Sequence, residues 1–222
     1  MITINNTEIF GWEATIRGMR NPLESWRKSD SKFIYDCKEC TDHCVDCFKT
    51  KSGGVIVGKN DRELMQKLAF GGSTHAKYRR MITVYVDITA PLYWWKEYDT
   101  YKVGTVANSC STMHKIHARD LQLNDFSHEH LTQENRLMIE DLIHCINKAR
   151  WRYMESGDKD EWWQMIQMLP TSFNQTRTVM LNYEVLTGIY RDRKAHKLDE
   201  WRTLCEWIEH LPMSEIITGK AR

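Results

Sequence analysis

The run RMITVYVDI, residues 80–88, constrains the fold of this chain more than any other feature of its sequence. Val, Ile and Thr favour extended backbone, so the run predicts a β-strand. The segment NDRELMQKLAFGG before it has helical periodicity, can be capped by Asn60 or Asp61, and stops at Gly71. A helix followed so closely by a strand predicts a mixed α/β domain.

The other periodic segments also predict both helices and strands. Pro91 suits the first turn of a helix over 91–101, and Thr132 can cap a long helix. We expect the buried face of that long helix to carry Leu137, Ile139, Leu142, Ile143 and Ile146. The remaining predicted elements are a strand or two over 1–20, a short helix over 161–169, a strand over 176–182, and closing helices over 183–196 and 199–211.

Composition is typical of a soluble globular protein. The 222 residues suit a single domain, 1–222, with an irregular Cys-containing insertion over 21–59. Apolar residues make up 41% and charged residues 27%, as in ordinary members of that class. A net charge of +1 gives no overall field toward nucleic acid or membrane, so we expect neither as a partner.

The sequence also predicts where the protein resides. Its first residues lack the basic start and apolar stretch of a signal peptide, and its apolar runs are shorter than the roughly 18–20 residues that span a bilayer. Seven Cys, an odd number, without a secretory signal favour reduced thiols. We therefore expect a cytoplasmic protein.

Four of the Cys form a regular cluster, C-x2-C-x3-C-x2-C, made of Cys37, Cys40, Cys44 and Cys47. Two C-x-x-C pairs suit tetrahedral zinc, although the gap between them is shorter than in a usual zinc ribbon. The same spacing is one stripe of a helix, where Cys packs as a small apolar residue. The pattern leaves packing, zinc and disulfides open, and we predict free thiols without a metal.

A second possible metal motif is the pair His114 and His117, whose spacing puts both on one helix face. No clear third ligand accompanies them, so we predict no metal there either.

A series of short motifs follows in a fixed order after residue 60. It runs from GG-x-x-H through a strand, A-P, an aromatic helix and a polar Ser/Asn-rich loop. A long helix, L-P, a strand ending in Asn, and a helix with an Arg before a His complete it. This order resembles flavin-dependent thymidylate synthases over residues 60–211. The resemblance implies a mixed α/β domain with an antiparallel sheet and long helices.

The family signature R-H-R-x-x-S-x-N-x-x-S-x-R-Y aligns with residues 100–113. Only Lys102 keeps a positive charge of the R-H-R, and Thr105 stands where the first Ser is. Asn108 and Ser111 match if one residue is inserted. The Arg of the final R-Y is absent, with His114 and Lys115 just beyond it.

The resemblance assigns roles to individual residues. His75, Lys102 and Asn182 correspond to positions that contact the flavin, which implies FAD as the cofactor. The nucleotide-binding residues that it implies are Asn108, Ser109, Ser111, Thr112 and Arg193. Ile166 replaces a phosphate-binding Arg of the family, and Arg177 on the next strand is a candidate to compensate for it.

Each assignment has a plainer alternative. The Asn108–Thr112 segment could simply cap a helix or make turns, Arg193 could lie on a solvated helix face, and His75 could be a structural loop residue. The family reaction uses no protein nucleophile, so Cys110 need not be catalytic and no catalytic residue is assigned.

Three functions remain open. The first is a flavin-dependent methyltransferase of nucleotide biosynthesis, which methylates dUMP or a related pyrimidine nucleotide reductively. Family members build each active site from several subunits, so this function implies a homotetramer. The second is a pyrimidine-nucleotide-binding protein that has lost flavin, and the third is a structural or partner-binding protein.

Overall fold

The protein is represented by a computed structural model that describes residues 1–34, 47–50 and 53–219. These residues form two compact units. The first comprises Met1–Thr3, Asp87–Thr100 and Ala107–Thr178, and the second comprises Ile4–Val86, Tyr101–Val106 and Val179–Arg222. The chain passes from one unit to the other after Thr3, Val86, Thr100, Val106 and Thr178.

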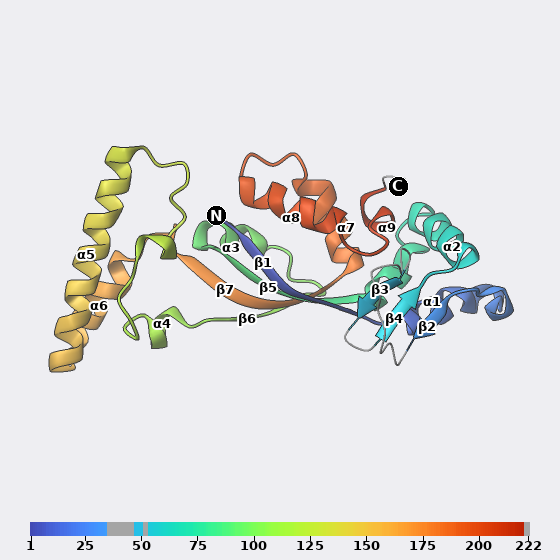
Figure 1. The fold of residues 1–222 in the computed structure, drawn as a ribbon, viewed down its shortest axis with the longest axis horizontal. Helices are drawn as coiled ribbons and strands as arrows, with labels where there is room; N and C mark the ends of the chain where they lie inside the picture. The colour runs from blue at the N-terminus through green and yellow to red at the C-terminus, as the bar shows by residue number, and fades with distance from the viewer. Residues whose placement is uncertain (35–46, 51–52, 220–222) are drawn as a thin grey trace. The chain divides into compact units, whose positions relative to one another are not determined.

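Figure 1 labels the strands and α-helices. The strands are β1 Thr3–Phe10, β2 Lys32–Ile34, β3 Cys47–Thr50, β4 Gly53–Ile56, β5 Thr83–Pro91, β6 Val106–Ser109 and β7 Asn174–Asn182. The α-helices are α1 Trp12–Arg20, α2 Lys59–Phe70, α3 Leu92–Tyr98, α4 Thr112–Lys115, α5 Gln133–Ser156, α6 Lys159–Met168, α7 Tyr183–Arg193, α8 Asp199–Glu209 and α9 Glu215–Thr218. The 3-10 turns are η1 Asn21–Leu23, η2 Trp26–Lys28, η3 Ala76–Met81 and η4 Leu123–Asp125.

The main sheet has the strand order β1-β5-β7-β6. In the first unit, Thr89 is hydrogen-bonded to Thr176 and Asp87 to Thr178, so β5 and β7 run antiparallel. From Thr83 to Ala90 the buried residues of β5 alternate along the strand and are Val84, Val86, Ile88 and Ala90. This alternation is the period of a strand with one face in the core. The mixed α/β fold with an antiparallel sheet is therefore confirmed.

The predicted strand over 80–88 is found, but it is shifted toward the C-terminus. Residues 80 and 81 belong to the 3-10 turn η3, and β5 begins at Thr83 and continues to Pro91. Pro91 is the N-terminal cap of α3 rather than a residue of its first turn.

The N-terminal prediction of one or two strands is half right. Residues 3–10 form β1, but residues 12–20 form α1, which buries Trp12, Ile16 and Met19 at helical spacing. Gly11 separates the two elements with φ +91°, and a Cβ there would lie 2.2 Å from the Met81 carbonyl oxygen. Only glycine fits this left-handed position.

Residues 21–59, expected to be irregular, contain a second sheet with the order β2-β4-β3. Both pairs are antiparallel, with Phe33 and Phe48 each opposite Val55. Of the cysteine cluster, Cys37, Cys40 and Cys44 lie outside the described residues, and only the backbone of Cys47, in β3, is described.

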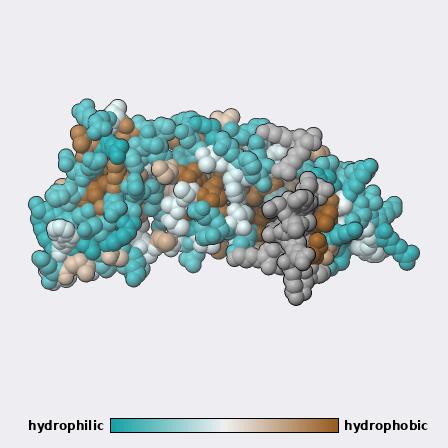
Figure 2. Space-filling model, in the orientation of Figure 1, coloured by the Kyte–Doolittle hydropathy of each residue, from teal (hydrophilic) through white to brown (hydrophobic). Residues whose placement is uncertain are grey.

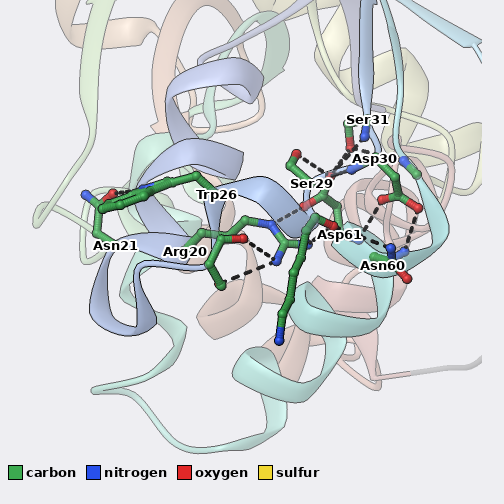
Figure 3. Close-up of polar contacts among 11 residues, drawn as sticks. Arg20, Asn21, Trp26, Ser29, Asp30, Ser31, Asn60 and Asp61 are labelled. Atoms are coloured by element: carbon green, nitrogen blue, oxygen red, sulfur yellow. Dashed lines mark hydrogen bonds and ion pairs between the residues drawn. The ribbon is translucent and has the colours of Figure 1, made fainter.

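A buried ion pair joins α1 to α2 in the second unit (Figure 3). Asp61 Oδ1 accepts from Arg20 Nε at 2.7 Å, and Asp61 Oδ2 accepts from Ser29 Oγ and Ser31 Oγ at 2.8 and 2.7 Å. Burial raises the pKa of Asp61, but hydrogen bonds from Ser31, Ser29 and Arg20 outweigh it, so the pKa lies below its usual value. The Asp61 carboxylate therefore has a structural role as a buried, charged hydrogen-bond acceptor.

Neither predicted cap of α2 is correct, because the helix begins at Lys59 and its N-terminal backbone is held from a distant segment. Asp30 Oδ2 accepts from Asn60 N at 3.0 Å, and Asp30 Oδ1 accepts from Asp61 N at 3.1 Å. A carboxylate at the first turn of a helix satisfies amides that have no partner within the helix.

The first unit has its own core around α5 and α6, which lie side by side (Figure 1). Thr132 Oγ1 accepts from Asn135 N, so the predicted cap of α5 is confirmed. The core cluster contains Ile143 and Ile146 as predicted, whereas Leu137 is 51% exposed. Figure 2 shows hydrophobic side chains among hydrophilic ones at these two helices.

The second unit packs α7, α8 and α9 over residues of α1, α2 and η3. Tyr183, Leu186 and Ile189 of α7 are fully buried, as is Trp201 of α8. Tyr183 packs its ring edge to face with Trp12 at 5.6 Å and donates its hydroxyl to the Pro212 carbonyl. These contacts hold the helix that carries Arg193.

No helix among the described residues is long and apolar enough to cross a membrane.

Candidate functional site

A cavity of about 520 Å³ lies in the first unit. Its walls come from Thr89 on β5, from residues between Cys110 and Asp125, and from Phe173 to Thr176 at the start of β7. A volume between roughly 300 and 1,000 Å³ is typical of small-molecule sites. The cavity is therefore large enough to hold a ligand of nucleotide size.

Backbone and side-chain hydrogen bonds fix the wall formed by residues 110–112. Cys110 N donates to the Thr176 carbonyl at 2.9 Å, and Gln175 Nε2 donates to the Cys110 carbonyl at 2.9 Å. Ser111 then caps α4, because its Oγ accepts from His114 N at 3.1 Å. Ser111 and Thr112 both line the cavity.

Charged side chains also line the cavity. Arg119 makes two hydrogen bonds to Asp125, at 2.7 and 2.5 Å. Burial raises the pKa of Asp125, but the bonds from Arg119 and from the Gln122 amide outweigh it, so the net shift is downward. The ammonium of Lys115, the third charged residue of the lining, makes no hydrogen bond or ion pair among the described residues.

The other two residues of the predicted nucleotide segment lie outside this lining. Asn108 and Ser109 belong to β6 and are exposed. The plainer reading of the segment as a cap holds for Ser111, whose side chain caps α4. A capping hydroxyl accepts one bond and keeps its own proton for another partner, so this role leaves Ser111 able to donate to a ligand.

Arg177, the candidate for phosphate binding, is engaged within the first unit. Its Nη1 donates to Asp99 Oδ1 at 2.8 Å and its Nε donates to Gln175 Oε1 at 3.0 Å. Its guanidinium also lies 4.2 Å from the centre of the Trp95 ring. Asp99 already balances its charge, and Arg177 is not part of the cavity lining.

Ile166, at the position where the resemblance implies a phosphate-binding Arg, lies on α6 and packs against the core around α5. The position is therefore used for packing in this chain.

Arg193 lies in the second unit at the end of α7, among aromatic rings. Its Nε donates to the Tyr101 hydroxyl at 2.9 Å, and its guanidinium lies 4.6 Å from the centre of the Trp201 ring. Tyr101 and Trp201 also meet edge to face, with ring centres 5.9 Å apart. Arg193 thus fastens the segment 101–106 to α7 and α8.

The three predicted flavin contacts all lie in the second unit. Asn182 caps α7, since its Oδ1 accepts from Glu184 N at 3.1 Å and from Val185 N at 3.0 Å. Gly104, with φ +79°, lies against Asn182 so closely that a Cβ would be 3.1 Å from its Nδ2. Lys102 of the same loop and His75 at the start of η3 are exposed.

The structure thus places the predicted site residues in two sets. Within the first unit it brings Ser111 and Thr112 to a cavity, and within the second it brings Lys102, Asn182 and Arg193 to one loop and one helix. The sequence offered no signal for Asn124, Gln175 or Arg119, which line the cavity only because the start of β7 lies beside residues 110–125.

Among the described residues, no group of three or more His, Cys, Asp or Glu side chains could hold a metal ion. His117 packs against Tyr153, with ring centres 5.2 Å apart. Cys110 and Cys145 are exposed free thiols, whereas Cys205 is buried.

No protein-family model matches the sequence, and no curated protein matches it. The structure is similar to two structures of the flavin-dependent thymidylate synthase ThyX from Helicobacter pylori, both with FAD and dUMP. Each similarity has a TM-score of 0.68 at 12% sequence identity, and covers 98% of this chain and 96% or 97% of the other. With nearly complete coverage of both chains, this chain has the fold of flavin-dependent thymidylate synthase.

Proposed function

We propose that this chain is a flavin-dependent, thymidylate synthase-like enzyme that methylates dUMP or a related pyrimidine nucleotide reductively. One observation carries the proposal: the segment aligned with the family signature leads into a cavity of about 520 Å³, and Ser111 and Thr112 of that segment line it. The full-length similarity to ThyX structures with FAD and dUMP supports it. In this function the chain is a transferase of nucleotide biosynthesis.

The donor set of the second unit fits a flavin chemically. A flavin presents acceptors, its ring carbonyls and its phosphates. Lys102 and His75 are exposed, and neither side chain has a hydrogen bond or ion pair among the described residues. Asn182 uses its amide oxygen for the helix cap, which leaves its amide NH2 as a donor. We propose that these three residues hold FAD, which supplies the hydride when bound.

We propose that the nucleotide is held by Asn108, Ser109, Ser111 and Thr112, with Arg193 and Arg177 as further contacts. Hydroxyl and amide groups suit the carbonyl and imide edge of a pyrimidine, because each can both donate and accept. Arg193 and Arg177 already contact Tyr101 and Asp99, so a phosphate would have to share or replace those partners.

We further propose a homotetramer in the cytoplasm, with one folding domain over residues 1–222. Exposed Leu137 and Met138 on α5 support an interface, because side chains of this kind are stabilised when a second subunit covers them. As the family resemblance implies, each active site would be completed by residues from several subunits.

A second function is favoured by the loss of arginines. Only Lys102 keeps a positive charge of the R-H-R motif, and Ile166 packs in a core where the family has an Arg. A protein with these changes could bind a pyrimidine nucleotide without flavin.

The absorbance spectrum of the protein, purified without added cofactor, tests the two functions. Flavin bands near stoichiometric amounts, and formation of the 5-methyl nucleotide from dUMP with a one-carbon donor and a reductant, are expected for the enzyme. A colourless protein that dUMP stabilises against heat would favour the second function. A ligand at about 100 times its dissociation constant adds roughly 2.7 kcal/mol of stability.

A further inference from the structure

The cavity in the first unit carries an unbalanced positive charge. Its lining contains the cations Lys115 and Arg119 and the carboxylate of Asp125, which sum to a net charge of +1. Arg119 and Asp125 face each other through two hydrogen bonds and cancel. The remaining charge is the Lys115 ammonium, which has no partner among the described residues.

In this unit, the two positions from which the resemblance leads us to expect phosphate binding are engaged in other contacts. Ile166 packs beside α5, and Arg177 is paired with Asp99 and stacked on Trp95. Lys115 lines the cavity, and its ammonium has no carboxylate partner among the described residues. Arg119 also lines the cavity but is paired with Asp125, and Arg177 lies outside the lining. An ammonium binds phosphate as a point charge and needs no planar geometry.

The rest of the lining suits a base and a sugar. Thr112 and Asn124 have side chains without a hydrogen-bond partner among the described residues, and both can donate and accept. Ile116, Leu121 and Phe173 provide apolar surface. Phe173 is held in place by Phe126, with ring centres 5.6 Å apart. A cavity with one cation that no carboxylate balances, neutral polar groups and apolar walls matches a nucleoside monophosphate.

We propose that Lys115 is the phosphate anchor of the nucleotide site, and that Thr112 and Asn124 hydrogen-bond to the base or the sugar. This inference rests on the proposed function, because it assumes that the ligand is a pyrimidine nucleotide. It adds an anchor that lies outside the family's signature and takes over from the lost arginine.

Calorimetric titration of the full chain with dUMP and with deoxyuridine tests the anchor. The wild type should bind dUMP more tightly than deoxyuridine. Lys115→Ala should weaken dUMP binding about 10- to 150-fold, the usual worth of a hydrogen bond to a charged group. It should leave deoxyuridine binding unchanged, and Lys115→Arg should retain part of the preference for dUMP. Lys148→Ala, an exposed lysine of α5 outside the cavity lining, should behave as wild type.

Alkylation of thiols, followed by peptide mass spectrometry, locates the ligand. Cys110 lines the cavity and is exposed, while Cys145 on α5 is exposed outside the lining. Saturating dUMP should slow alkylation of Cys110 in the wild type and leave Cys145 unchanged. In Lys115→Ala the same dUMP concentration should protect Cys110 much less.

The outcomes separate the two proposals. If the wild type binds dUMP and Lys115→Ala keeps the full preference for dUMP over deoxyuridine, the anchor is wrong while the nucleotide function survives. If dUMP binds without protecting Cys110, the cavity is not the site and the anchor again fails. If the wild type binds neither ligand, the proposed function and the anchor fail together.

Discussion

Asp61 Oδ1 accepts a hydrogen bond from Arg20 Nε at 2.7 Å, and the two side chains are 0% and 4% exposed. Breaking a buried ion pair from one side leaves the other charge without compensation, which costs about 3–5 kcal/mol. We therefore expect Asp61→Asn to lower the free energy of unfolding by that amount in urea denaturation. Asp192→Asn should change it by less than about 1 kcal/mol, because its partner Arg191 is 76% exposed. Equal effects of the two substitutions would contradict the structural role of the buried pair.

The same pair predicts how stability depends on pH. The pKa of Asp61 in the folded protein lies below its unfolded value of about 3.9, so its stabilisation is fully present above that value. It is lost as pH falls through the folded pKa. The difference in unfolding free energy between wild type and Asp61→Asn should therefore stay constant from about pH 7 to 5 and shrink below about pH 4. Urea unfolding across that range measures the difference. A difference that grows on acidification would contradict a lowered pKa of Asp61 in the folded protein.

Removing the Arg193 side chain should lower the stability of the protein, because this side chain makes contacts within the fold. Its bond to Tyr101 and its position over Trp201 predict that Arg193→Ala loses about 0.5–2 kcal/mol of stability. If Arg193 also binds the phosphate, dUMP affinity should fall about 10- to 150-fold, with partial recovery in Arg193→Lys. Melting curves and calorimetry measure both effects. The control is Arg191→Ala, an exposed residue of α7 two positions earlier. Unchanged dUMP affinity in Arg193→Ala would show that Arg193 has a packing role only.

Lys102 provides a test of the flavin site. Its ammonium is exposed and has no ion pair among the described residues, so Lys102→Ala should leave the melting temperature nearly unchanged. It should reduce FAD affinity about 10-fold or more, because a hydrogen bond to a charged group is worth about 1.5–3 kcal/mol. Fluorescence titration of the apoprotein with FAD measures this. Lys77→Ala, an exposed lysine of η3, is a matched control. Identical FAD binding in all three proteins would remove Lys102 from the site.

If the protein is a homotetramer, its sedimentation coefficient at micromolar concentration should be that of a particle of four chains. If α5 contributes to the interface, Leu137→Asp should shift the protein toward smaller species, since burying an unpaired carboxylate is costly. Lys148→Ala on the same helix should remain tetrameric. A monomeric wild type would count against active sites shared between subunits.

Elements whose signals are local could be predicted from the sequence. Thr132 caps α5 by a bond to the amide three residues on, and the alternation of β5 follows its β-branched residues. Predictions failed where a distant partner decided the outcome. Asn60 or Asp61 was expected to cap α2, but the helix begins before both, and Arg20, 41 positions away from Asp61, binds that carboxylate instead.

Leu137 shows a second kind of limit. At 3.6 residues per turn it lies about 180° around α5 from Ile146, so helical geometry places it on the opposite face, and it is exposed. The prediction that Leu137 belongs to the buried face was therefore wrong. Ile139, Leu142, Ile143 and Ile146 do share one face, and all four pack in the core cluster.

The cavity depends on neither propensity nor periodicity. The bond from Cys110 N to the Thr176 carbonyl joins segments that are 66 positions apart, and it brings residues of the 110–125 stretch beside Gln175. The resemblance could assign Ser111 and Thr112 through their alignment. It had no means of assigning Asn124, because that residue belongs to the site through its place in space alone.

Gly104 lies against the amide of Asn182 and the Cγ2 of Val185, at 3.1 and 3.3 Å from where its Cβ would be. Because of this contact, the residue at position 104 limits which side chains fit at positions 182 and 185. A lineage that acquires a side chain at 104 has to accept a strained left-handed residue and also a smaller group at 182 or 185. We therefore expect these positions to covary among relatives, so that the loop carrying Lys102 and the first turn of α7 are inherited as one unit.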